Sequence, residues 1–153
     1  MRNASNAILS SVERALQSKM EIVRGLLHYE DNELEFELSE VVFGEYSIPG
    51  SGHYYQVVID GNVFASSMSL VNPEFEFTMP GEFLYDEWGV MYSSLGPENE
   101  RVRVMRSDFM FLSKYTTIII AESIEDSISI INTIRMYVIA ILSFTIFIAC
   151  FMN

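Results

Sequence analysis

The stretch HYYQVVIDGNVFAS, residues 53–66, decides the class of fold. It contains an apolar, β-branched run at 54–59, the turn Asp60-Gly61-Asn62, and a second apolar run at 63–66. Asp-Gly supplies the positive φ angles that a tight hairpin turn requires, so these residues predict two antiparallel strands. An antiparallel sheet is therefore expected.

Further strands are predicted on both sides of this hairpin. Glu33, Glu35 and Glu37 alternate with leucine and phenylalanine, which is the pattern of a half-buried strand. Downstream, strands are expected at 87–94, 102–112 and 115–121, where aromatic and β-branched residues are enriched. Residues 71–85 contain two prolines and a glycine and are expected to form a loop with a short extended piece.

Helices are predicted before and after the strands. Residues 5–29 carry one narrow apolar stripe, typical of a helix that packs on a dimer partner as well as on its own domain. The stripe consists of Leu9, Val12, Leu16, Met20, Val23 and Leu27. A connecting helix is expected at 123–135, with isoleucines along one face. The order helix, strands, helix predicts an α+β, PAS-like antiparallel sheet over residues 5–122, with the sheet at 33–121 and the terminal helices side by side.

A transmembrane helix is predicted at 136–152. The sequence MYVIAILSFTIFIACFM holds 17 residues without a charge, enough to cross a bilayer. The alternative is a buried helix, but a segment apolar on every face would need a much larger protein around it. The single cysteine, Cys150, lies in this segment, so no intramolecular disulfide can form.

The charge balance limits the partners. With 21 acidic against 9 basic residues, the net charge is -12, which repels phosphate backbones and excludes nucleic acid as a partner. A cationic partner is compatible with this charge. Residues 1–11 contain no apolar segment that would serve as a signal peptide or first membrane span. We therefore expect either a piece of a longer protein or a tail-anchored protein that faces the cytoplasm.

Two segments resemble a known family. Residues 53–70 are similar to a stretch of the N-terminal extracytoplasmic sensor domain of bacterial two-component sensor histidine kinases of the QseC and TctE type. The matching positions are Tyr54, Tyr55, Gln56, Val57, Asp60, Gly61, Ser66, Ser67, Ser69 and Leu70. Residues 102–126 resemble a second passage of that family, through Arg103, Val104, Phe109, 118–120 and the run AESIEDSI.

The resemblance implies a signal-sensing input region in the bacterial inner membrane, with its sensor part facing the periplasm or the cell exterior. Such a region would act as a homodimer and pass a ligand-induced change through its C-terminal transmembrane helix. The kinase catalytic region does not occur in this sequence, so this chain is not expected to be an enzyme. A response regulator would be reached only through that kinase region. The alternative is a tail-anchored membrane interaction protein with an acidic cytoplasmic domain and no kinase.

Candidate ligand-binding residues come from two groups. Arg101, Arg103 and Arg106 cluster in an otherwise acidic domain, and arginine forks bind carboxylates well. Because TctE-type relatives are associated with tricarboxylates, a small carboxylate ligand is implied; pairing with the chain's own carboxylates is the alternative. Tyr54 and Tyr55 are expected to line a pocket, or to belong to the core, together with Trp88 and Tyr92.

Other polar residues suggest no chemistry. His28 and His53 have no catalytic motif around them. The acid rows Glu33-Glu35-Glu37 and Glu74-Glu76 would collect cations or form solvated strand faces. We expect no catalytic residue, metal site or cofactor, and the stimulus is not identified.

Overall fold

The computed structural model describes residues 2–30, 33–36, 44–81 and 88–125. The chain begins with helix α1 (Arg2–Gly25), followed by a small hairpin of β1 (Leu27–Glu30) and β2 (Glu33–Phe36). Two short 3-10 helices, η1 (Gly44–Ser47) and η2 (Met68–Leu70), precede and follow the first hairpin of the main sheet. The strands of that sheet are β3 (His53–Ile59), β4 (Asn62–Ser66), β5 (Val90–Leu95), β6 (Arg101–Phe111) and β7 (Lys114–Ser123).

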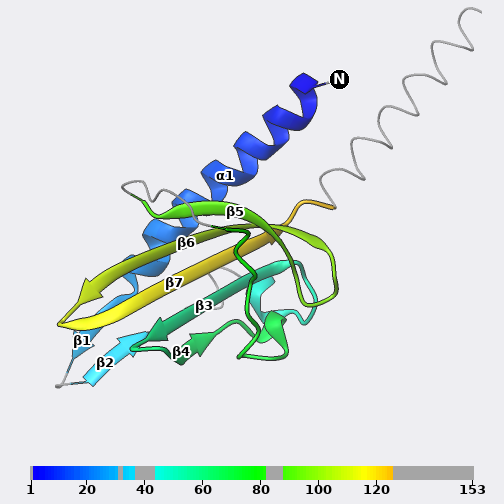
Figure 1. The fold of residues 1–153 in the computed structure, drawn as a ribbon. Helices are drawn as coiled ribbons and strands as arrows, with labels where there is room; N and C mark the ends of the chain where they lie inside the picture. The colour runs from blue at the N-terminus through cyan, green and yellow to red at the C-terminus, as the bar shows by residue number, and fades with distance from the viewer. Residues whose placement is uncertain (1, 31–32, 37–43, 82–87, 126–153) are drawn as a thin grey trace, which may run out of the picture.

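The main sheet is antiparallel and has the order β4-β3-β7-β6-β5. The last strand of the described residues, β7, therefore lies at the centre, between β3 and β6 (Figure 1). The β3–β4 turn has φ of 49° at Asp60 and 81° at Gly61, which confirms the predicted hairpin. The β6–β7 turn also uses two positive φ angles, at Leu112 and Ser113.

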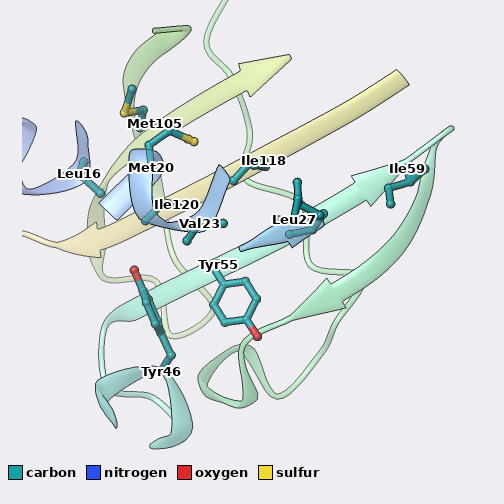
Figure 2. Close-up of a cluster of buried hydrophobic side chains, with 11 residues drawn as sticks. Leu16, Met20, Val23, Leu27, Tyr46, Tyr55, Ile59, Met105, Ile118 and Ile120 are labelled. Carbon is teal, nitrogen blue, oxygen red and sulfur yellow. The ribbon is translucent and has the colours of Figure 1, made fainter. Parts of the chain in front are cut away.

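Helix α1 covers one face of the sheet and contacts β6 and β7 (Figure 1). Figure 2 shows Leu16, Met20 and Val23 of α1 against the sheet, in one buried cluster with Ile118 and Ile120 of β7. Burying each such side chain stabilises the fold by about 2 kcal/mol. The predicted apolar stripe thus anchors the helix to the sheet.

The opposite face carries a second core beneath the irregular segment 71–81. Because side chains alternate along a strand, Tyr54 and Ala121 face away from α1 while their neighbours face it. Tyr54 and Ala121 are buried in one cluster with Leu70 and Phe77. The sheet is thus covered by α1 on one side and by this segment on the other.

The predicted α+β architecture, with an antiparallel sheet and an N-terminal helix, is confirmed, but two boundaries were wrong. The helix ends at Gly25 rather than at residue 29, because glycine disfavours helix and Leu26 N closes the last turn on Ile22 O at 3.1 Å. Leu27 then begins β1 and still reaches the core. Ser123, the expected start of a second helix, is the last residue of β7.

The predicted membrane segment is not part of this description. Among the helices of the described residues, none combines the length and the apolar character needed to cross a membrane. Residues 136–152, and the connecting helix from 126 onward, lie outside the described residues and stay predictions.

Candidate functional site

An open groove of about 750 Å³ lies on the sheet face opposite α1. Its floor includes Thr117 and Ile119 of β7, whose neighbours Ile118 and Ile120 face the helix. The groove is lined by Gln56, Val58, Gly61, Asn62, Val63, Glu74, Phe75, Glu76, Phe77, Arg106, Tyr115, Thr117 and Ile119. The groove therefore brings together residues of four strands, β3, β4, β6 and β7, and of the irregular segment.

The groove wall is fixed to the sheet by Gln56. This side chain is only 3% exposed, and its amide donates to the carbonyl oxygens of Pro73 (2.5 Å) and Phe75 (2.9 Å). Phe75 and Phe77 also pack edge-to-face, with ring centroids 5.0 Å apart. A buried amide with both donors satisfied holds the wall segment in place, so the groove is formed before any ligand arrives.

The positive charge of Arg106 is compensated by Asp108 of the same strand. Its Nε lies 3.0 Å from Asp108 Oδ2 and its Nη2 lies 3.1 Å from Asp108 Oδ1, which is a bidentate ion pair. Thr117 Oγ1 donates to the same Oδ1 at 2.5 Å. The guanidinium is therefore oriented and neutralised by its own chain.

The five residues predicted to bind ligand do not form one site. Of these five, only Arg106 lines the groove. Arg101 is exposed, with Nε 3.8 Å from Glu125 Oε1, and Arg103 lies on the α1 side. Tyr54 and Tyr55 are buried on opposite faces, in separate clusters.

Arg103 forms an ion pair with helix α1, which explains its position on that face of the sheet. Arg103 Nη2 donates to Glu13 Oε1 of α1 at 2.5 Å, so this arginine attaches the helix to β6. Each of the three arginines thus pairs with a carboxylate of the chain, which is the alternative that the sequence left open.

The Tyr54 hydroxyl donates to Glu100 Oε1 at 2.6 Å, and burial together with that carboxylate raises the pKa of Tyr54.

A partly buried charged cluster lies on the other face, between α1 and the end of β7. Lys19 Nζ contacts Glu122 Oε1 and lies 3.1 Å from Glu45 Oε1, while His53 Nδ1 is 3.7 Å from Glu122 Oε1. Burial alone would raise the pKa of Glu122, but His53 and the ammonium of Lys19 outweigh it and lower the pKa. The same ammonium lies 5.5 Å from the ring centroid of the buried Tyr46. No sequence motif indicated this cluster, because its members come from four separate elements.

The remaining candidates are distributed as follows. Tyr92 is buried, whereas Trp88 is 38% exposed, so the expected aromatic set does not line one pocket. Glu74 and Glu76 are exposed on the groove wall. In the described part of the chain, no group of three or more histidine, cysteine, aspartate or glutamate side chains could hold a metal ion. The side chains of His28, Glu33, Glu35 and Glu37 lie outside the described residues.

Comparisons with protein-family models, with curated proteins and with solved structures find no match. The resemblance to sensor kinases therefore stays a prediction from the sequence. The structure adds two features on opposite faces of one sheet, an open groove and a partly buried charged cluster.

Proposed function

We propose that the chain is the extracytoplasmic sensing region of a bacterial two-component sensor histidine kinase, with a PAS-like domain. Counted from β3, the strands of the main sheet stand in the order two-one-five-four-three. This order supports the PAS-like assignment, because PAS-like sheets also place their first and last strands side by side at the centre. The long N-terminal helix on one face is compatible with it.

The observation that carries the proposal is that β7 belongs to both faces. Thr117 and Ile119 line the groove, while Ile118 and Ile120 pack against α1. The strand then ends at Ser123, where the predicted connecting helix would lead toward the membrane. A ligand that binds two positions of β7 unequally would therefore shift α1 and the exit of the chain together.

The membrane and dimer parts of the proposal rest on the sequence and on α1. The apolar segment 136–152 would place the domain next to the inner membrane, with the sensor part in the periplasm. On α1, Ile22 is 40% exposed although its neighbours on the buried stripe are not. A single exposed apolar side chain is ordinary on a protein surface, so pairing of two copies through α1 is proposed from the narrow apolar stripe of the sequence.

The test is a fusion of residues 1–153 behind a supplied first membrane helix and in front of a reporter histidine kinase. Val58→Trp places an indole in the groove, and Met68→Trp places one on an exposed site outside it. We expect the groove variant to change reporter phosphorylation several-fold and the Met68 variant to match the parent. Equal phosphorylation in all three fusions would contradict the proposal, as would topology probes that locate Asn153 outside the cell.

A further inference from the structure

The groove carries an excess of negative charge. Glu74 and Glu76 line its wall, and within the described residues neither carboxylate is in an ion pair. The one basic residue among the lining side chains of the groove, Arg106, is already neutralised by Asp108. A carboxylate ligand would have to displace Asp108 and lie beside two glutamates, whereas a cation would meet two uncompensated charges.

Aromatic rings accompany these carboxylates. Phe75, Phe77 and Tyr115 line the same groove, and Tyr115 is 49% exposed. The face of an aromatic ring attracts an ammonium or guanidinium group, and most strongly when water is partly excluded. The described residues offer no cluster of oxygen ligands that a hard metal ion needs. The lining therefore suits an organic cation better than a metal.

We propose that this groove binds a small organic cation, held by Glu74 and Glu76 against the ring of Phe75 between them. The net charge of -12 increases the local concentration of cations around the domain and speeds their association. The proposal rests on the proposed function only in treating the groove as the input site. The ligand proposed here is positively charged, whereas the resemblance to TctE-type relatives implied a negatively charged carboxylate.

The test uses two probes of equal length and opposite charge, butane-1,4-diamine and butanedioate, on the full chain in detergent micelles. We expect the diamine to raise the unfolding temperature in a concentration-dependent way, and the dioate to leave it unchanged. The double variant Glu74→Gln/Glu76→Gln should weaken diamine binding about 10-fold, since partly exposed charge pairs each contribute modestly.

A matched control separates the groove from the general charge of the domain. Glu21→Gln/Glu98→Gln also removes two negative charges, at exposed positions outside the groove, and should bind the diamine as the parent does. Equal loss in both double variants, or no stabilisation by the diamine, overturns the proposal. If butanedioate stabilises the parent chain but not Arg106→Gln, the groove binds an anion. That result overturns the proposal of a cationic ligand and still leaves the groove as a candidate sensing site. The reporter fusion with Val58→Trp tests that sensing role separately.

Discussion

Removing the ammonium of Lys19 should destabilise the domain strongly, because it leaves Glu122 buried without its partner. The Glu122 side chain is 9% exposed and that of Lys19 is 16% exposed. Breaking a buried pair by deleting one partner costs about 3–5 kcal/mol, and the nearby His53 places Lys19→Met near the lower end. We expect a loss of about 3 kcal/mol at pH 7, measured by urea unfolding of the full chain in micelles with the fluorescence of Trp88.

The stability lost in Lys19→Met should depend on pH, because the charge of Glu122 does. In the parent chain the pKa of Glu122 is lowered, so its contribution is present above the ordinary carboxyl pKa and is lost as the pH falls through the folded value. In Lys19→Met, only His53 still opposes the burial that raises the pKa of Glu122, so this pKa rises relative to the parent and protonation relieves the buried charge. The stability difference between parent and variant should therefore shrink from pH 7 to pH 4.

Two further variants make the reasoning refutable. Arg14→Met changes an exposed residue of the same helix and should alter stability by less than about 0.5 kcal/mol. Lys19→Met/Glu122→Gln removes both charges and should recover part of the loss, because no uncompensated charge stays buried. A cost below about 1 kcal/mol for Lys19→Met, or a cost that is the same at pH 4 and pH 7, would refute the account.

Three other predictions concern the packing on the two faces of the sheet. Gly89→Ala should destabilise by several kcal/mol, seen as a lower urea midpoint, because a Cβ at this positive-φ position would lie 2.1 Å from Arg106 O. Gln56→Ala should cost about 1–2 kcal/mol and increase proteolysis within residues 71–81, since two wall carbonyls lose their donors; unchanged cleavage would contradict the role of Gln56. Ile120→Ala should cost about 2–4 kcal/mol by thermal unfolding, because it leaves a cavity where α1 packs on β7.

Local signals in the sequence predicted the sheet well. The Asp60-Gly61 pair fixed the first hairpin because its positive φ angles are a backbone requirement and depend on nothing distant. The end of α1 was missed because Leu27 continues the helical stripe and also fits a strand, and both environments bury it. Only Gly25 distinguished the two, and a glycine lowers helix stability by about 1 kcal/mol without ending a helix by itself.

The candidate site was harder to predict, for two different reasons. The sequence alone was enough to predict that Arg106 lies apart from Arg103. The two residues are three positions apart, so in a strand their side chains lie on opposite faces. The Lys19–Glu122 pair was not readable, because it joins residues 103 positions apart with no local pattern. The same holds for Glu74, which belongs to an irregular segment whose side-chain directions follow no period.

If the chain senses a ligand as proposed, coupling from the groove to the residues after β7 would depend on how firmly β7 is held at its end. Ser123 N donates to Gly52 O at 2.7 Å, and Ile124 N donates to Arg101 O at 3.0 Å, so backbone bonds attach this end to both sides. The exit therefore cannot move independently of the sheet. Under the proposed function, the contact that would differ between two states is the one between β7 and α1, where Lys19 meets Glu122. Because Lys19 contacts both Glu122 and Glu45, a shift of α1 along the sheet would have to break or exchange these ion pairs, which favours discrete helix positions over a gradual slide.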